Sequence, residues 1–261
     1  MLRHLLLAAT FVVGPFTATA QNLEGRLVGD MTGAIVRTTG LTGEMSVTMP
    51  AETQDRTVTE VLRFEPWQML DELFRDDIVL VMRHGPTDWS MRDASDVAPT
   101  DCDDQRVMTE DGKERMRQLG VLLVANGLVP GRIMVSEWCR NQETLAALSE
   151  GMLEIDDAAL LGKPIETVPA LNLLLSLQGA PNVTEMRQII TNWDGSDGTG
   201  PLLLISHYTN IEELTEFRVY EGELLVVDPK RDNRVLGYLR LKSAGPDAGH
   251  FPDDVVKTAA D

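Results

Sequence analysis

Two arginines and two histidines in this sequence carry side chains that could together handle a phosphoryl group. They are Arg83, His84, Arg140 and His207. A guanidinium group donates forked hydrogen bonds to phosphoryl oxygens, and an imidazole can attack phosphorus or donate a proton. Each residue alone is a weak signal, because an Arg-His-Gly sequence is usually chance and a strand-end histidine is more often a satisfied surface residue. The hypothesis depends on whether the fold brings the four together.

Each of these residues follows a short apolar stretch that is typical of a buried strand. Residues 78–82 (Ile-Val-Leu-Val-Met) are rich in β-branched types, and residues 132–136 and 201–206 are also mainly apolar. An open α/β sheet binds its ligand at the carboxyl ends of parallel strands. If the three predicted strands are parallel neighbours, their ends converge. Gly85 has no side chain, which lets another group approach the backbone closely.

The rest of the chain alternates between helical and strand patterns, which predicts an α/β fold. We expect a three-layer sandwich, in which a mostly parallel sheet carries helices on both faces. Residues 171–177 are ambiguous between helix and coil. Apolar spacing and capping residues predict helices at 64–74, 109–125, 137–151, 184–193 and 211–217, and further strands at 165–168, 223–227 and 235–241.

The N-terminus has the pattern of a cleaved secretory signal. Arg3 precedes apolar residues 5–16, and residues 18–20 (Ala-Thr-Ala) resemble a cleavage site. A membrane anchor, the alternative, needs about 20 apolar residues, and a Gly-Pro pair at residues 14–15 interrupts this stretch. We therefore expect cleavage after Ala20, a periplasmic or secreted protein, and no membrane attachment after cleavage.

The formal net charge is −18. A chain this acidic is a poor partner for nucleic acid or for an anionic membrane surface. An anionic substrate is still compatible with the sequence, but its site must then supply its own positive charge.

Cys102 and Cys139 are the two cysteines of the chain. In an exported protein, an even pair favours one disulfide, which would contribute about 3–4 kcal/mol in the chain-entropy model. Two buried thiols are the alternative. A bridge would fix the backbone beside Arg140.

These motifs resemble the signatures of the histidine phosphatase superfamily, which has the phosphoglycerate-mutase-like fold. The resemblance covers about residues 76–241. Its main motifs are Arg83-His84-Gly85-Pro86-Thr87 with Trp89-Ser90, then Ser136-Glu-Trp-Cys-Arg140-x-x-Glu143-Thr144, and Leu204-Ile-Ser-His207. An exported bacterial branch of the superfamily is more similar, through Cys102-x-x-Gln105-Arg106-x-Met108-Thr109-x-x-Gly112, Trp138-Cys139-Arg140, His207-x-x-Asn210-Ile211 and Gly222-Glu223.

The resemblance implies a phosphatase in which His84 is the nucleophile and becomes a phosphohistidine. Arg83, Arg140 and His207 would hold the phosphoryl oxygens and stabilise the developing charge. Three further residues would bind substrate: Thr87, Ser90, where many relatives have Asn, and Arg106. The resemblance implies no metal and no cofactor. The expected substrate is a small-molecule phosphate ester or a phosphorylated peptide.

The general acid of this family has no clear counterpart here. The family places a carboxylate either after a leucine ahead of the second histidine, where Leu173 stands, or directly after that histidine, where Tyr208 stands. Four acids could substitute, namely Glu223, Glu221, Glu166 and Asp88, and Glu223 is the choice because Gly222-Glu223 recurs in the similar branch. Without a positioned acid, we expect a preference for phosphohistidine or aryl phosphates, whose leaving groups need little help.

The proposed organisation is a signal peptide at 1–20, an extension at 21–62, a histidine phosphatase-like domain at 63–242 and a polar tail at 243–261. The extension is either a loose β-hairpin or a flexible lead-in. His250, in the Gly- and Pro-containing tail, is expected to be structural or incidental. Three alternatives to a phosphatase are a phosphate- or phosphoprotein-binding module that has lost turnover, a mutase, and a domain whose buried cations serve stability alone.

Overall fold

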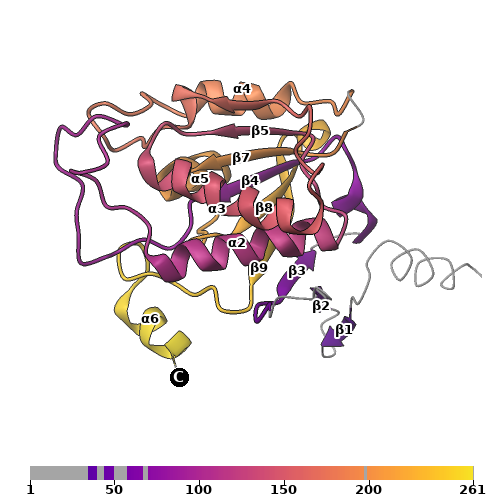
Figure 1. The fold of residues 1–261 in the computed structure, drawn as a ribbon. Helices are drawn as coiled ribbons and strands as arrows, with labels where there is room; N and C mark the ends of the chain where they lie inside the picture. Colours follow the sequence, from indigo (N-terminus) through magenta and orange to yellow (C-terminus); the bar gives the residue numbers. More distant parts are fainter. Residues whose placement is uncertain (1–34, 40–43, 50–57, 67–69, 197–198, 261) are drawn as a thin grey trace, which may run out of the picture.

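The computed structural model describes residues 35–39, 44–49, 58–66, 70–196 and 199–260 (Figure 1). The predicted signal peptide lies outside these residues. Within them, no helix combines the length and hydrophobicity that a membrane crossing requires.

The described residues form one nine-stranded mixed sheet. The half that contains the predicted site is parallel, whereas the other half is antiparallel. In spatial order, the strands are β1 (Ile35–Thr39), β2 (Glu44–Met49), β3 (Leu62–Pro66), β9 (Arg234–Leu241), β8 (Leu224–Asp228), β4 (Val79–Arg83), β7 (Leu202–Ser206), β5 (Arg132–Val135) and β6 (Ile165–Thr167).

The three strands that carry the predicted site are adjacent and parallel, as predicted. β7 lies between β4 and β5, and the register pairs Arg83 with Ser206 and Ile205 with Val135. The carboxyl ends of the three strands therefore lie at the same level of one sheet edge. This register brings His84, Arg140 and His207 toward one another.

Helices cover both faces of the sheet, which confirms the three-layer α/β class. Along β4, Leu80 and Met82 pack toward α2 (Glu110–Ala125) and α3 (Cys139–Ile155). Val79 and Val81 pack on the opposite face, toward α4 (Thr184–Thr191) and α5 (Tyr208–Thr215). Every residue of β4 is buried, which accounts for the continuous apolar run in the sequence.

One predicted helix is wrong, and part of the adjoining extension lies within the described residues. Residues 64–74 were expected to be helical, but Leu62–Pro66 forms β3 and only Leu70–Phe74 forms a short 3₁₀ helix, η1. Pairing of β3 with β9 accounts for the difference, because tertiary pairing overrides a weak local helical pattern. β1 and β2 pair antiparallel, which favours the hairpin reading of the extension.

The remaining elements connect the sheet or extend beyond it. The ambiguous stretch 171–177 begins with the last residue of a short 3₁₀ helix, η2 (Pro169–Leu171), and has no helix or strand after it. A third short 3₁₀ helix, η3 (Pro229–Arg231), joins β8 to β9. The tail ends in α6 (Asp253–Ala260), which lies below the sheet in Figure 1.

Candidate active site

The fold brings the four predicted residues together. His84, Arg140 and His207 line a cleft of about 510 Å³, and the ring centroids of the two histidines are 5.6 Å apart. Arg83 lies close enough for its charge to act on both imidazoles. None of the four residues is more than 2% exposed. Together they form one buried cluster rather than four separate surface groups.

Backbone hydrogen bonds fix how the strand ends meet. The Ser206 carbonyl accepts from the His84 backbone N–H (3.1 Å) and from the Asn141 side chain (3.0 Å). The Gly85 N–H donates to the Thr144 hydroxyl at 2.8 Å, and Thr144 belongs to the helix that carries the second arginine. A Cβ on Gly85 would overlap the side chains of Met108 and Met116, so a larger residue here would displace these methionines.

His84 is held in the form that a nucleophile needs. Its Nδ1 lies 2.9 Å from the Gly85 carbonyl, which can only accept a hydrogen bond, so Nδ1 carries the proton. Nε2 therefore keeps its lone pair. Burial, then the charges of Arg140 and Arg83, lower the pKa of His84 well below its usual 6.5. The imidazole is neutral at physiological pH.

His207 is oriented by a chain of hydrogen bonds that ends on a carboxylate. Glu137 accepts from the Asn172 amide (2.7 Å), which fixes the Asn172 oxygen as the acceptor for the Ser136 hydroxyl (2.9 Å). Ser136 Oγ must then accept from His207 Nε2, 3.0 Å away. His207 Nδ1 is buried and has no partner among the described residues. Burial and the neighbouring arginines lower the pKa of His207 well below 6.5.

Asp93, which the sequence analysis missed, holds Arg140 in a two-point ion pair. Its carboxylate oxygens lie 3.0 and 3.1 Å from Nη1 and Nη2 of Arg140. Asp93 sits in a polar loop without periodicity, so no pattern marked it. One signal was available: a bridge from Cys102 to Cys139 would draw this loop toward the arginine.

Arg83 is also paired with acids. Its Nη1 donates to Asp247 (2.6 Å) and to the Val219 carbonyl (2.9 Å), and its Nη2 lies 3.5 Å from Glu221. A buried guanidinium needs such partners, because desolvation of an unpaired charge is costly. Asp247 comes from the C-terminal tail, outside the predicted domain, so the tail contributes directly to the site.

Several buried polar atoms in this cluster have no partner among the described residues. They are the Nε atoms of Arg83, Arg106 and Arg140, together with Nδ1 of His207. Buried polar groups are normally hydrogen-bonded, and a group of exceptions needs a reason. A tetrahedral oxyanion in the cleft would supply acceptors for the N–H groups of Arg106 and Arg140, which line it, whereas Arg83 does not. This arrangement therefore suits phosphate binding.

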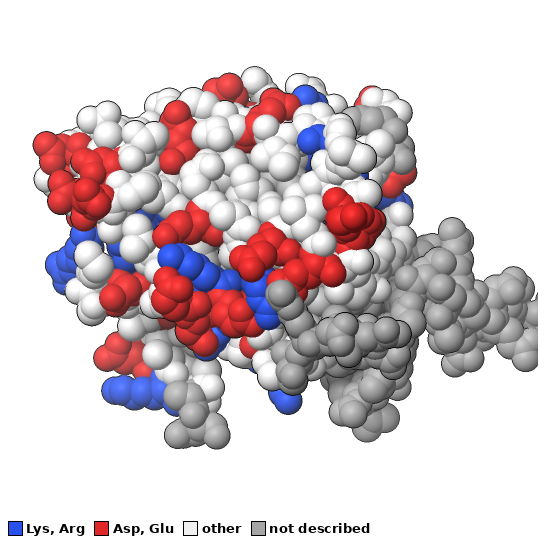
Figure 2. Space-filling model, in the orientation of Figure 1, with Lys and Arg blue, Asp and Glu red and all other residues white. Residues whose placement is uncertain are grey.

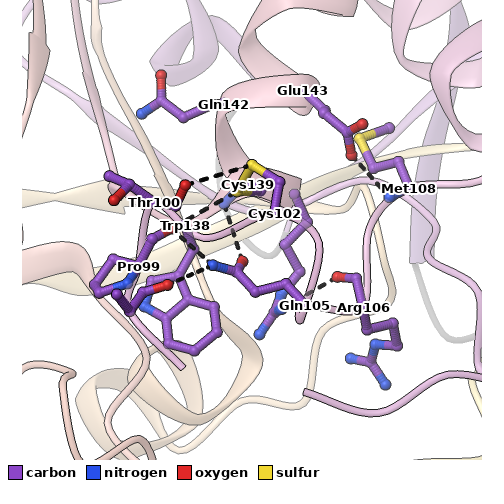
Figure 3. The surroundings of a disulfide bond; sticks show 12 residues. Pro99, Thr100, Cys102, Gln105, Arg106, Met108, Trp138, Cys139, Gln142 and Glu143 are labelled. Atoms are coloured by element: carbon purple, nitrogen blue, oxygen red, sulfur yellow. Dashed lines mark hydrogen bonds between the residues drawn. A yellow bond between two sulfur atoms is a disulfide. The ribbon is translucent and has the colours of Figure 1, made fainter. Parts of the chain in front are cut away.

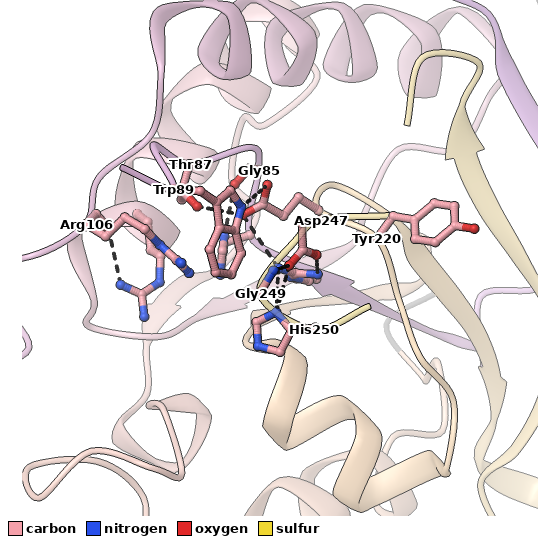
Figure 4. Close-up of polar contacts among 12 residues, drawn as sticks. Gly85, Thr87, Trp89, Arg106, Tyr220, Asp247, Gly249 and His250 are labelled. Carbon is pink, nitrogen blue, oxygen red and sulfur yellow. Dashed lines mark hydrogen bonds and ion pairs between the residues drawn. The ribbon is translucent and has the colours of Figure 1, made fainter. Parts of the chain in front are cut away.

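Arg106 is a further cation at the cleft, as predicted. Its guanidinium carbon lies 3.6 Å from the centroid of the Trp89 ring (Figure 4), and both residues line the cleft. Burial, then the charge of Arg140, lower the pKa of Arg106 to about 10. Among the described residues it forms no ion pair with an acid, so its charge is available to a ligand.

The predicted disulfide between Cys102 and Cys139 is confirmed (Figure 3). Its Cα atoms are 5.6 Å apart. Gln105 reinforces the attachment, since its amide oxygen accepts from the Cys139 N–H (3.1 Å) and its amide nitrogen donates to the Pro99 carbonyl (2.8 Å). The bridge thus attaches the loop that carries Asp93 to the first turn of α3.

The geometry contradicts Glu223 as the general acid. Its carboxylate accepts from the Tyr220 N–H (2.8 Å) and pairs with Arg240 (3.5 Å), a residue that the β8–β9 pairing brings near it. It does not line the cleft. The other three acids considered, Glu221, Glu166 and Asp88, do not line it either.

Two predicted substrate-binding hydroxyls also lie outside the cleft lining. Thr87 is buried and donates to Glu221 at 2.6 Å. Ser90 is exposed and donates to Asp88 at 2.6 Å. Both hydroxyls are already committed to carboxylates, so neither is a direct contact for a phosphoryl group in this structure.

His250 occupies a different place from the incidental one expected. It lines the same cleft as His84, and its Nδ1 lies 2.9 Å from Asp247 (Figure 4). The sequence offered little to find it, because it stands outside any predicted element. Among the described residues, no group of three or more His, Cys, Asp or Glu side chains could hold a metal ion.

No protein-family model matches the sequence, and no curated protein matches it. The fold is similar to that of several solved structures at low identity. The protein histidine phosphatase SixA complexed with tungstate is 20% identical, with a TM-score of 0.43, and the match covers 61% of this chain and 93% of that one. The putative phosphohistidine phosphatase SixA from Agrobacterium tumefaciens is 16% identical, with a TM-score of 0.41 and coverages of 66% and 98%. Its counterpart from Nakamurella multipartitia is 16% identical, with a TM-score of 0.40 and coverages of 66% and 96%.

Proposed function

We propose that this protein is an exported phosphatase of the histidine phosphatase type, which hydrolyses a phosphomonoester or phosphoramidate through a phosphohistidine on His84. One observation carries the proposal. A neutral imidazole with its Nε2 lone pair free lies in a buried cluster whose arginine Nε–H donors have no partner among the described residues. A nucleophile and an oxyanion cradle are the two parts that this reaction needs.

The reaction follows from these positions. His84 Nε2 attacks phosphorus, a nitrogen–phosphorus bond forms, and the bond to the leaving group breaks. Arg140, which lines the cleft, holds the equatorial oxygens, and Arg83 adds its positive charge beside the two imidazoles. His207 donates to an oxygen only as an imidazolium, because its Nε2–H is given to Ser136. Water then attacks the phosphohistidine, the nitrogen–phosphorus bond breaks, and its electron pair returns to Nε2. Arg106 adds a positive charge at the cleft. No metal takes part in the proposed steps.

The test compares wild type with His84→Ala on a panel of aryl phosphates, alkyl phosphates and a phosphohistidine peptide, in the absence of added metal. We expect turnover by wild type and none by the variant. Asp88→Ala, which removes a carboxylate of the adjacent loop that does not line the cleft, is the control and should retain activity. Equal activity of wild type and His84→Ala would end the nucleophile assignment.

The alternative is a binding module of the same fold that has lost turnover. Among the described residues, the one carboxylate that lines the cleft, Asp93, is paired with Arg140. The family's usual carboxylic acid therefore has no counterpart there. A burst of the alcohol or phenol leaving group, accompanied by an acid-labile phosphoenzyme, excludes this alternative. Phosphate binding without turnover on the whole panel supports it.

Export is proposed from the pattern of residues 1–20, and the disulfide is in keeping with an oxidising compartment. Mass spectrometry of the protein purified from a secreting host should find a mature chain that begins at Gln21. A chain retained in the cytoplasm with its first residues intact would contradict export.

A further inference from the structure

The C-terminal tail contains an Asp-His pair at the same cleft as the nucleophile. Resting on the function proposed above, we infer that His250, oriented by Asp247, gives a proton to the leaving group and later takes one from the attacking water. This assignment fills the role for which the sequence offered no carboxylate. It also replaces the expectation of a preference for substrates with good leaving groups.

The contacts of Asp247 determine which nitrogen of His250 acts. One carboxylate oxygen lies 2.9 Å from His250 Nδ1, and the other accepts from Arg83 Nη1 at 2.6 Å. A carboxylate accepts hydrogen bonds only, and it lies nearer to Nδ1 than the Arg83 Nη2 donor at 3.3 Å does, so Nδ1 carries a proton. Nε2, on the far side of the ring, is then the atom that gains and loses the exchangeable proton. Within the described residues, no protein group hydrogen-bonds to Nε2.

Aromatic contacts hold the ring at the cleft. His250 stacks on Tyr208 with 4.0 Å between ring centroids and meets the edge of Trp89 at 5.4 Å. Its side chain is 23% exposed, whereas that of Asp247 is 5% exposed. The carboxylate is thus shielded while the imidazole stays open to the cleft that His84 lines. Such a buried orienting acid behind a more exposed imidazole is how proteins fix a proton-transfer group.

The titratable groups around the His250 imidazole come from three segments of the chain. The groups that face it are Asp247 on its own segment, Arg83 from β4 with Nη2 3.3 Å from Nδ1, and Tyr208 from α5. Glu221 reaches Arg83 from the other side. Burial alone would raise the pKa of Asp247, but hydrogen bonds from His250 and Arg83 lower it well below its usual value. Asp247 therefore stays anionic and offsets the cation beside it.

The proton balance is as follows. When the bond from phosphorus to the leaving-group oxygen breaks, its electron pair stays on that oxygen, which takes the Nε2 proton of the His250 imidazolium. His250 is then neutral, with Nδ1–H still donated to Asp247. In the second step the attacking water loses a proton to Nε2 as its oxygen bonds to phosphorus, which restores the imidazolium.

The test compares His250→Gln with wild type on two substrates, p-nitrophenyl phosphate and glycerol 2-phosphate. Nitrophenolate leaves without help, whereas an alkoxide needs a proton. We expect kcat/KM for the alkyl substrate to fall by about 10²–10⁴-fold, the usual contribution of a positioned acid, and that for the aryl substrate to change little. A purely structural role would lower both equally, and that result, or no change in either, overturns the inference.

Chemical rescue provides a second readout on a different variant. In His250→Ala, added imidazole should restore alkyl phosphate turnover without affecting the aryl substrate. Absence of rescue in a folded variant that still binds inorganic phosphate counts against the inference. Loss of all activity in His84→Ala but a non-selective effect of His250→Gln leaves the proposed function standing and removes His250 alone.

Discussion

At the scale of single residues, the histidines at the site are distinguished by what their neighbours do to the imidazole. Burial and two arginines keep His84 neutral, and its Nδ1 proton is committed to a backbone carbonyl. His207 is neutral for the same reason, but its ring is oriented by the hydrogen bond between Nε2 and the Ser136 hydroxyl. His250 instead has a carboxylate partner. The same side chain is thus given three different hydrogen-bonding states by its surroundings, which fit the proposed roles of His84 as nucleophile and His250 as proton carrier.

The depressed pKa values predict how stability depends on pH. An unfolded histidine takes up a proton below about its usual 6.5, whereas buried His84 and His207 do not. The unfolded state then binds more protons, so the free energy of unfolding should fall as pH drops below 6.5. Urea denaturation of wild type and His207→Gln at pH 7.5 and pH 5 tests this, because the variant should lose less stability. An equal or larger loss in the variant would contradict it.

Asp93→Ala should destabilise the protein, because it removes the acid that pairs with buried Arg140. Arg140 would lose its ion pair, and we expect the free energy of unfolding to fall by about 1–3 kcal/mol, the cost of a buried group left unsatisfied. Inorganic phosphate should restore part of that loss by pairing with the guanidinium. Thermal unfolding with and without phosphate measures both effects, and Asp88→Ala is the control. A phosphate-induced rise in Tm smaller than that of wild type would argue against the cradle.

The residues that could be predicted were those attached to regular elements. His84, Arg140 and His207 follow buried strands, so their convergence followed from the order of apolar runs. Asp93 and His250 stand in irregular segments, where no period constrains which way a side chain points. Glu223 was misassigned because it was chosen from the Gly222-Glu223 motif alone. The sequence does not show that β9 places Arg240 beside this carboxylate.

At the scale of elements, the loop between β4 and α2 supplies much of the cleft, and the disulfide attaches it to α3. The Cys102→Ser/Cys139→Ser double variant should lose about 3–4 kcal/mol of unfolding free energy, given the 37-residue separation. Its KM for phosphate esters should rise because Asp93 and Arg106 are less well placed. Reduction of wild type should reproduce both changes. An unchanged KM would contradict the positioning role of the bridge.

The tail offers a matched pair of glycines for testing how it docks. A Cβ on Gly249 would overlap the Trp89 ring, whereas one on Gly245 would meet nothing within 4 Å (Figure 4). Gly249→Ala should therefore displace the segment that carries His250 and lower alkyl phosphate turnover more than aryl turnover. Gly245→Ala should resemble wild type in both assays. Similar behaviour of the two variants would show that docking of the tail has no role.

Element types were predicted well where burial leaves a local pattern, either a continuous apolar run or a helical period. The strand β4 and the helices α2 and α3 agree with their patterns, including Thr109 as the residue that caps α2. The strand β3 does not agree with its predicted helical pattern, because its structure depends on pairing with β9, which is far away in sequence. Long-range pairing of this kind leaves no local signal.

At the scale of the whole molecule, an acidic protein carries a positively lined cleft. The net charge is −18, and acidic side chains are prominent on the face that carries α2 and α3 (Figure 2). The negative electrostatic field of the whole molecule should repel an anionic substrate, while the buried arginines attract it at short range. Burial protects that short-range attraction from salt, whereas the long-range repulsion is screened.

Higher ionic strength should therefore raise the reaction rate with an anionic substrate. Raising it from about 10 mM to about 100 mM shortens the screening length from about 30 Å to about 10 Å. We expect kcat/KM for p-nitrophenyl phosphate to rise over this range, as repulsion weakens. Steady-state rates in potassium chloride at fixed pH measure the effect. A steep fall would mean that exposed cations, not the buried cluster, capture the substrate.

The central claim is a covalent bond between phosphorus and His84 Nε2. The most direct measurement is a single turnover with ³²P-labelled substrate, stopped in alkali within milliseconds, followed by mass spectrometric mapping of the labelled peptide. The account predicts a transient, acid-labile phosphoryl group on His84 that decays as phosphate appears and is absent from His84→Ala. Phosphate release without labelled protein at any time, or a label on another residue, would contradict it.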